Sequence, residues 1–520
     1  KRRCWGILIT TWWPEEAGAT SGTGVFAKAG AAASASRLNP SFFMMLFSVR
    51  IMRGGIIPQT PAICGKMPPF CAFGRNGRGE MAIVAVKKDA VAQADLFEAD
   101  VSGWDSEGRG IVRRDGKAVF VSDALPGERV LCRVTRAGKS FDEAEAVRVI
   151  RPSESRRTPP CPHYAECGGC SMQHVEFAAQ VAMKQRAVEE QCERIGRVRP
   201  AQMLAPVYGL PWHYRERGRF GAETDERGRL KIGFRAKRSN RVADISSCMV
   251  LPRRLSAVLP LLKEALQTFV GVLRGIEFAV GGGKTALCLL TDKRPSEKQR
   301  GALWALSEAL SSGWLLSWKT GNREEPLYEG QGGLSYWLDD FAVEMPFSVG
   351  SFTQVNAELN NVMVRRAVDM LSLQRGERVV DLFCGLGNFT LPLARSGAQV
   401  TGVEGLAALT DRARRNAALN GCGNVSFETA DLFCADGLSR FWRGADKMLL
   451  DPPRAGAYEV VKSLRPSEMP ARVVYISCNP ASFARDAAVL VEKGYKFKSL
   501  GVMNLFSQTA HVESVGCFER

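Results

Sequence analysis

The stretch GERVVDLFCGLGNFTLPLA, residues 376–394, decides the fold. Its apolar run predicts a buried β-strand, its glycines predict a tight turn, and the apolar residues that follow predict a helix. Gly385 and Gly387 let the backbone turn at the carboxyl end of the strand, where open α/β sheets bind ligands. Taken alone, the glycines are equally compatible with a structural turn that binds nothing.

Two acidic residues lie at the ends of the next two predicted strands after this turn. The segment AQVTGVEG ends near Glu404, about 20 residues past the first glycine, where a carboxylate can accept hydrogen bonds from both ribose hydroxyls. The segment ETADLF places Asp431 after a third strand, suited to an adenine amino group. Together with the glycine turn, the two acids predict a nucleoside cofactor at the carboxyl edge of a parallel sheet.

Two further strands bring reactive groups to the same edge. ADKMLLDPPRAGA, residues 445–457, runs from apolar residues into Asp451, and the two prolines behind it stiffen the chain. ARVVYIS, residues 471–477, delivers Cys478. A free cysteine is most often a small buried hydrophobe. At a strand end beside a nucleoside cofactor, however, core packing explains Cys478 poorly, and its position favours a nucleophile.

Composition restricts the class of protein. The chain has 520 residues, 45% of them hydrophobic, a net charge of +16 and no apolar run long enough for a transmembrane helix. The charge predicts an anionic partner that offers phosphate groups, with a merely solvated basic surface as the alternative. The odd number of 15 cysteines indicates a reducing compartment, and the cytoplasm is expected.

The chain divides into four parts by composition and pattern. Residues 1–87 are irregular and low in acids, which predicts a disordered or non-native extension with Met81 as the true start. Residues 88–150 alternate in the manner of short strands and predict a small, basic, OB-like β-barrel. Residues 151–345 predict a mixed α+β central domain that includes a helix over 177–196. Residues 346–520 predict an α/β, Rossmann-like domain.

A cysteine cluster opens the central part. Cys161, Cys167 and Cys170 form a C-x5-C-x2-C pattern, and Cys248 is the best-placed fourth ligand. Zinc and a [4Fe-4S] cluster both accept four thiolates. The five-residue gap does not suit a zinc ribbon built from two C-x2-C knuckles, and a closed structural cluster fits better. Unrelated free thiols are the alternative.

The motifs resemble one family as a set. SFTQVN (351–356), DLFCGLGNFTLPLA, LLDPPRAGA, YISCNPASFARD (475–486) and the terminal HVESV resemble the RNA 5-methyluridine methyltransferases. The resemblance implies a TRAM domain over 88–150, an iron–sulfur site at the four cysteines and a catalytic domain over 346–520 that uses S-adenosylmethionine. Having both the TRAM domain and the cluster resembles the bacterial 23S rRNA branch of the family.

The resemblance also implies residue roles. Cys478 becomes the nucleophile that adds to C6 of uracil, and Glu513 becomes the base that removes the C5 proton. Asp451 lies between methyl donor and uracil, with its two roles not separated. The S-adenosylmethionine contacts that carry over are Gln354, Phe383, Asn388, Glu404, Asp431 and Asp451. The segment NLFSQTAHVE departs from the family at Ser507, where a proline is usual.

Other interpretations stay open. The target could be a uridine in tRNA or at another rRNA site. Cytosine-C5 methylation would predict a second cysteine near Asp451, and LLDPPRAGA contains none. A non-catalytic RNA-binding assembly factor would leave Cys478, Glu513 and Asp451 unexplained. We expect a monomer that binds RNA, most simply 23S rRNA, and no membrane.

Overall fold

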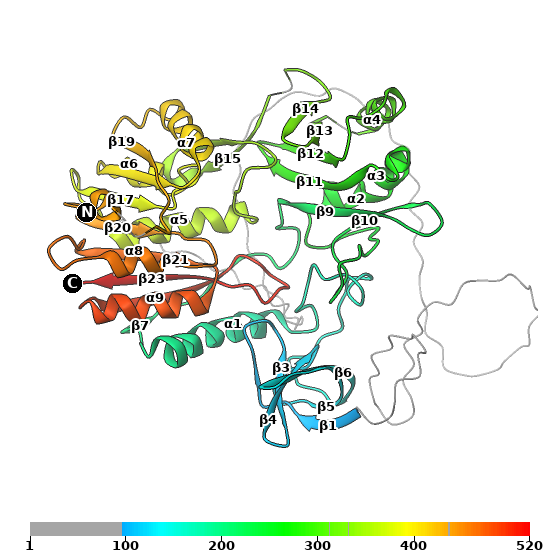
Figure 1. Cartoon of the computed structure of the whole chain (residues 1–520), viewed down its shortest axis with the longest axis horizontal. Helices are drawn as coiled ribbons and strands as arrows, with labels where there is room; N and C mark the ends of the chain where they lie inside the picture. Colours follow the sequence, from blue (N-terminus) through cyan, green and yellow to red (C-terminus); the bar gives the residue numbers. More distant parts are fainter. Residues whose placement is uncertain (1–95, 311, 331, 435–436) are drawn as a thin grey trace, which may run out of the picture. The chain divides into compact units, whose positions relative to one another are not determined.

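The computed structural model describes residues 96–310, 312–330, 332–434 and 437–520 (Figure 1). All of these residues belong to one compact unit, residues 71–520. The extension predicted over residues 1–87 lies outside the described residues, and so do residues 88–95. None of the described helices is long and apolar enough to cross a membrane.

The first described segment is a six-stranded sheet. Its strands are β1 (Leu96–Asp100), β2 (Gly103–Trp104), β3 (Gly110–Arg114), β4 (Lys117–Ser122), β5 (Arg129–Ala137) and β6 (Phe141–Arg151), in the order β1-β5-β6-β4-β3-β2. Val130 and Cys132 are fully buried, on the inward face that the alternation predicts. Among the described pairings, none joins β1 to β2. The strands are therefore confirmed, and closure into an OB-like barrel stays a prediction.

The central segment contains a second six-stranded sheet, in the order β10-β9-β11-β12-β13-β14. Phe220 and Phe278 stack at 4.7 Å in its core. The strands are β9 (Arg217–Thr224), β10 (Leu230–Gly233), β11 (Leu273–Gly281), β12 (Lys284–Thr291), β13 (Trp314–Thr320) and β14 (Arg323–Pro326). The helices beside it are α2 (Arg253–Ala257), α3 (Leu259–Ala265) and α4 (Glu297–Ala309). The hairpin β15 (Leu334–Leu338) and β16 (Val343–Phe347) follows.

The helix predicted over 177–196 is present in two pieces. α1 runs from Phe177 to Gln191, and η2 continues it as a π-helical turn from Cys192 to Gly196. Glu176 caps the amino end of α1, where its carboxylate accepts a hydrogen bond from the backbone N–H of Ala179 at 2.9 Å. Its buried side chains include Gln180 and Lys184, two polar residues that the apolar pattern did not predict inside.

The third sheet is the α/β layer predicted for residues 346–520. Its order is β19-β18-β17-β20-β21-β23-β22-β7, and β8 also pairs with β22. The strands are β17 (Arg378–Leu382), β18 (Gln399–Glu404), β19 (Val425–Thr429), β20 (Lys447–Leu450), β21 (Arg472–Ser477), β22 (Lys496–Asn504) and β23 (Glu513–Glu519). All its neighbouring pairs are parallel except those made by β23. β7 (Gln202–Met203) and β8 (Val207–Tyr208) extend the sheet with residues that precede position 346.

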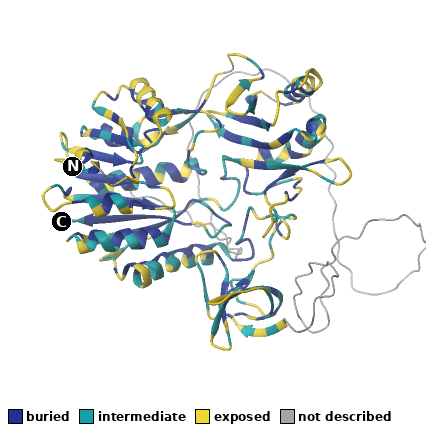
Figure 2. Ribbon diagram, viewed as in Figure 1, coloured by how far each residue is buried: buried dark blue, intermediate teal, exposed yellow. Residues whose placement is uncertain are grey.

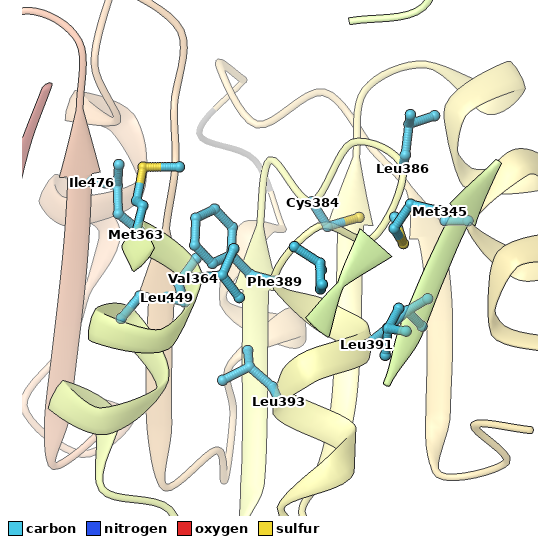
Figure 3. Packing of buried hydrophobic residues seen from close by; sticks show 14 of the residues in the cluster. Met345, Met363, Val364, Cys384, Leu386, Phe389, Leu391, Leu393, Leu449 and Ile476 are labelled. Atoms are coloured by element: carbon cyan, nitrogen blue, oxygen red, sulfur yellow. The ribbon is translucent and has the colours of Figure 1, made fainter. Parts of the chain in front are cut away.

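Helices cover both faces of this sheet. Val379 packs into one buried cluster with α5 (Ala357–Leu371), α6 (Thr390–Arg395) and α7 (Ala407–Leu419), part of which Figure 3 shows. The next residue, Val380, packs into another with α1, α8 (Tyr458–Ser463) and α9 (Pro480–Glu492). The strands are accordingly apolar on both faces and buried between helices (Figure 2).

Candidate active site

The order of the third sheet creates a switch point. From β17 the chain proceeds to β18 and β19 on one side, and β20 and β21 lie on the other side. Two neighbouring strands whose connections leave in opposite directions open a crevice at their carboxyl ends, where such sheets bind ligands. Every motif that the sequence singled out in residues 376–478 ends at this edge (Figure 1).

The glycine turn after β17 requires left-handed backbone. Gly385 and Gly387 have φ values of 55° and 93°, and Phe383 shares this conformation at 66°. Glu404, at the end of β18, accepts hydrogen bonds from the backbone N–H of Gly385 at 3.2 Å and of Leu406 at 3.1 Å. The carboxylate predicted to hold a ribose therefore also fixes the turn beside it.

An aromatic pair borders the turn. Asp431 follows β19 and accepts a hydrogen bond from the backbone N–H of Phe433 at 2.9 Å. The exposed Phe433 ring lies beside Phe383, with 5.7 Å between ring centroids. The sequence motifs did not predict Phe433 as a site residue. An aromatic residue two positions after a predicted adenine-binding acid was the available signal.

Two further predicted cofactor contacts, Asn388 and Gln354, lie in the glycine turn and before α5. Asn388 and Asn360 exchange hydrogen bonds of 3.0 Å, and the Tyr336 hydroxyl donates to Asn388 at 2.9 Å. This network holds the turn against α5. Gln354 is half-buried in the segment before α5. A role for Asn388 and Gln354 in cofactor binding stays a prediction.

The predicted catalytic residues come from three adjacent strands. β21 pairs with β23 so that Ser477 faces Ser514, which makes Cys478 and Glu513 neighbours at the sheet edge. β20 pairs with β21 in parallel, and Asp451 is the first residue beyond β20. The fold thus brings together Asp451, Cys478 and Glu513, which are distant in sequence.

Burial and charge shape the ionisation of these three groups. Burial raises the pKa of Cys478 to about 11, and the carboxyls of Glu513 and Asp451 contribute to this rise. Burial also raises the pKa of Glu513 well above its usual range and that of Asp451 to about 7. The site without RNA therefore favours a protonated thiol beside two carboxyls that resist ionisation.

Arg454 and His511 complete the edge, and the sequence motifs did not single them out. Arg454 lowers the pKa of Cys478, whereas burial, Glu513 and Asp451 raise it. Its guanidinium lies 2.9 Å from Nδ1 of His511, and Asn479 donates to its backbone carbonyl at 2.9 Å. Both side chains are exposed and border a large cleft.

The loop that carries Arg454 is rigidly supported. Asp486 on α9 accepts hydrogen bonds from the Tyr475 hydroxyl at 2.7 Å and the Ala457 N–H at 2.8 Å. A side chain at Gly456 would lie 2.5 Å from the same carboxylate, and its φ is 82°, so only glycine fits there.

The cleft has a volume of about 940 Å³ and extends from Arg454 and His511 to the second sheet. Its walls come from the β2–β3 turn, the cysteine loop, the second sheet and the segment before β23. Its basic lining residues include Arg215, Arg219, Arg235, Arg274 and Arg454. A wide, positively charged cleft of this kind suits a polyanion.

The four predicted metal-binding cysteines lie together. Cys161, Cys167, Cys170 and Cys248 line one small cavity. Burial raises the pKa of Cys170 to about 12 and that of Cys248 to about 11, and neighbouring thiols of the set contribute to both shifts. Within the described residues, no group of three or more His, Cys, Asp or Glu converges on the position of a single ion.

The fold and the residues at the carboxyl edge of the third sheet define a class of protein. They are those of a Rossmann-like, S-adenosylmethionine-dependent methyltransferase: a largely parallel sheet with a switch point, a glycine turn after β17 and an acid at the end of β18. Comparison with known proteins names the family within that class. The family model described as tRNA (Uracil-5-)-methyltransferase matches residues 210–520. The chain belongs to this family of RNA (uracil-C5)-methyltransferases.

Individual relatives agree with this assignment. The 23S rRNA (uracil(1939)-C(5))-methyltransferase RlmD of Neisseria lactamica is 50% identical over 82% of this chain and 96% of its own length. The protein of the same name from an Azoarcus species is 46% identical over 81% of this chain and 99% of its own. The crystal structure of the Pyrococcus abyssi tRNA (uracil-54, C5)-methyltransferase, solved with S-adenosyl-L-homocysteine, shares the fold. It has a TM-score of 0.63 at 23% identity and covers 81% of this chain and 100% of that one.

Proposed function

We propose that this enzyme transfers a methyl group from S-adenosylmethionine to C5 of a uridine in 23S rRNA, at the site equivalent to uracil 1939. The observation that carries the choice of RNA is the 50% identity to the Neisseria lactamica enzyme over 96% of that enzyme's length. The basic cleft is lined by Arg454, whose charge acts on Cys478, and it supports a large RNA substrate. A ribosomal substrate in a bacterium would place the reaction in the cytoplasm.

The proposed mechanism uses covalent catalysis. Uracil C5 is too weak a nucleophile to attack a sulfonium methyl group unaided, so Cys478 adds through its sulfur to C6 and makes C5 an enolate carbon. C5 then attacks the methyl group of S-adenosylmethionine; the sulfur–methyl bond breaks with its electron pair kept on sulfur, and S-adenosylhomocysteine leaves. Glu513 removes the proton from C5, the C6–sulfur bond breaks, and the C5–C6 double bond returns. The adjacency of Cys478 and Glu513 on β21 and β23 supports this division of labour.

The electrostatics suit these roles. The raised pKa of Glu513 makes its ionised form a stronger base than an ordinary carboxylate. The guanidinium of Arg454 favours the thiolate of Cys478. Asp451 lies between the glycine turn and Cys478, where it can contact either the methyl donor or the uracil. Glu404 and Asp431 would hold the ribose and the adenine, with Phe383 and Phe433 beside them.

RNA would enter through the cleft. The target base must leave its stack to reach Cys478, and unpaired bases do so at the lowest cost. The arginines that line the cleft would neutralise backbone phosphates. The six-stranded unit over residues 96–151, which we propose to be a TRAM domain, contributes Ser106 and Glu107 to the cleft wall. We expect the enzyme to act as a monomer.

The four cysteines fit a [4Fe-4S] cluster, which we propose as their ligand. In such a cluster each thiolate binds its own iron atom, so the sulfur atoms surround a cavity and need not converge on one point. The one cavity that all four cysteines line supports this arrangement. Cys161, Cys167, Cys170 and Cys248 would hold the group, whose contribution is structural.

The cluster predicts a coloured protein. Protein purified without oxygen should be brown and contain iron and acid-labile sulfide, and Cys248→Ser should lose most of both because one iron is left without its thiolate. Cys288→Ser, at a buried cysteine outside this cavity, is the control and should keep the colour. A colourless wild-type protein that contains zinc would refute the assignment.

A uridine in tRNA is the alternative substrate, because the family model and the Pyrococcus abyssi structure carry tRNA names. Mapping 5-methyluridine in rRNA and tRNA from cells with and without the gene separates the two. We expect one 23S rRNA uridine to lose its methyl group and tRNA to be unchanged. Loss from tRNA alone would overturn the proposed substrate. Loss from neither would favour a non-catalytic role.

A further inference from the structure

Part of the loop that leads to Glu513 is buried, although loops usually run over the surface. Residues 505–512 connect β22 to β23, and we call them the 505–512 loop. Leu505 and Ser507 are fully buried, and Gln508 is 3% exposed. Gln508 also adopts a φ of 66°, a left-handed conformation that a non-glycine residue keeps only when its surroundings hold it.

The residues that hold this loop come from α1. Gln180 and Gln508 form a reciprocal pair: the Gln180 side-chain amide donates to Oε1 of Gln508 at 3.0 Å, and the Gln508 backbone N–H donates to Oε1 of Gln180 at 3.1 Å. Lys184, one turn further along α1, donates to Oδ1 of Asn504 at 2.6 Å and to the carbonyl of Phe506 at 2.9 Å. Two buried side chains of one helix thus hold the strained segment at several points.

Lys184 and Gln180 are costly as ordinary core residues. Both are 1% exposed, and burial without hydrogen bonds would be strongly unfavourable for either. Burial also lowers the pKa of Lys184 to about 7. Aliphatic side chains would fill the same space without this cost. The polar side chains instead donate and accept at fixed points: both bond the 505–512 loop, Lys184 also bonds Asn504 at the end of β22, and Gln180 also donates to the carbonyls of Met172 and Val175.

The cysteine loop holds the same segment from the other side. Ser171 and Met172, which follow Cys170, donate their backbone N–H groups to the carbonyl of Gln508 at 2.9 and 3.0 Å. The Ser171 hydroxyl accepts from the N–H of Ala510 at 3.1 Å. The Tyr214 hydroxyl donates to the carbonyl of Ser507 at 2.6 Å.

The 505–512 loop leads directly into the proposed base. Glu513 is the first residue of β23 and forms the last pair of the β22–β23 ladder, opposite Met503, so the loop sets how its side chain meets Cys478. His511, within the loop, contacts Arg454. We propose that Gln180 and Lys184 are positioning residues for proton abstraction: through the 505–512 loop they orient Glu513 toward C5 of the substrate. This inference rests on the proposed mechanism.

The test uses the full-length enzyme with Gln180→Met, Lys184→Met and Gln508→Gly. Gln508→Gly removes the Gln508 side chain, and glycine tolerates the left-handed backbone at this position. This variant keeps the proposal testable if Gln180→Met or Lys184→Met prevents folding. Gln185→Met is the matched control, since Gln185 lies on α1 and bonds Glu189 of the same helix. Amide hydrogen exchange in the 505–512 loop should accelerate about tenfold, as expected for losing a buried hydrogen bond. The control should exchange like wild type.

Kinetics separate positioning from general destabilisation. We expect kcat to fall roughly 10- to 100-fold, because a misoriented Glu513 loses part of the rate enhancement that a positioned base contributes. KM for RNA and for S-adenosylmethionine should stay nearly unchanged. Because methyl transfer precedes proton abstraction, a covalent enzyme–RNA complex should accumulate on ordinary uridine RNA, visible as a slower band in denaturing gels. Wild type and Gln185→Met should show no such band.

The outcomes are distinguishable. Variants that keep the wild-type kcat, or that only raise KM for RNA, would overturn the positioning role while leaving the proposed function intact. A wild-type enzyme that methylates no uridine would overturn the proposed function, and the inference with it.

Discussion

Replacing Cys478 with serine is expected to lower uridine methylation by more than about 10³-fold, because removing the nucleophile removes the covalent route. The measurement is transfer of labelled methyl groups from S-adenosylmethionine to 23S rRNA fragments. RNA that contains 5-fluorouridine should form a stable covalent complex with the wild type, since fluorine at C5 blocks the elimination step. Cys478→Ser should form none.

A second cysteine provides the control for this prediction. Cys422, just after α7, is buried, and its sulfur lies 3.8 Å from the carbonyl of Asn420. Serine can keep that contact, so Cys422→Ser should methylate at the wild-type rate. Methylation by Cys478→Ser at the wild-type rate would refute the mechanism outright.

The ionisation of Cys478 can be followed separately by alkylation. Only the thiolate reacts, and the pKa of Cys478 is about 11, so alkylation of the RNA-free enzyme should rise about tenfold per pH unit through neutrality. Arg454→Gln should react more slowly at each pH, because the guanidinium favours the thiolate. A rate that levels off near pH 7 would show that the thiol is already ionised there.

Replacing Glu513 with glutamine is expected to slow turnover by roughly 10²–10⁴-fold, the usual contribution of a positioned base. Cys478 can still add to C6 and C5 can still be methylated, but the proton at C5 stays in place. A covalent complex that contains the transferred methyl group should therefore accumulate on ordinary uridine RNA. Full turnover without a complex would exclude Glu513 as the base.

The same variant has a predicted effect on stability. The pKa of Glu513 in the folded protein is raised above its ordinary value of 4.5, so the native state binds a proton that the unfolded chain releases. Stability from this group is present below pH 4.5 and is lost as pH rises toward the raised pKa. The Tm of Glu513→Gln minus that of wild type should therefore increase with pH.

Several elements of the site follow from local sequence, because their geometry is local. β20 and β21 are short apolar runs, and Asp451 and Cys478 follow directly at their carboxyl ends. Parallel strands share one edge, so a pattern that fixes the strand also fixes where the next residue lies. The glycine turn was predictable for the same reason.

Other elements depend on contacts that no local pattern contains. The adjacency of Cys478 and Glu513 follows from antiparallel insertion of β23 between β21 and β22. Arg454 meets His511 because the loops after β20 and before β23 converge. Lys184 lies on a helix whose weak amphipathic pattern placed apolar residues inside and gave no reason to bury an amine.

The sequence by itself determined the α/β class of residues 346–520, the edge where the cofactor site lies and the position of the candidate nucleophile, because strands, turns and their end residues are encoded over a few positions. The tertiary structure decided which of these groups meet. It gathered four cysteines from residues 161–248 around one cavity and set the pairing that presents Glu513 to Cys478. It also buried Gln180 and Lys184 against a segment far along the chain, with separations of 328 and 320 positions in the bonded pairs. Such contacts are chosen by packing and hydrogen-bond satisfaction across the whole fold, which a local pattern cannot specify.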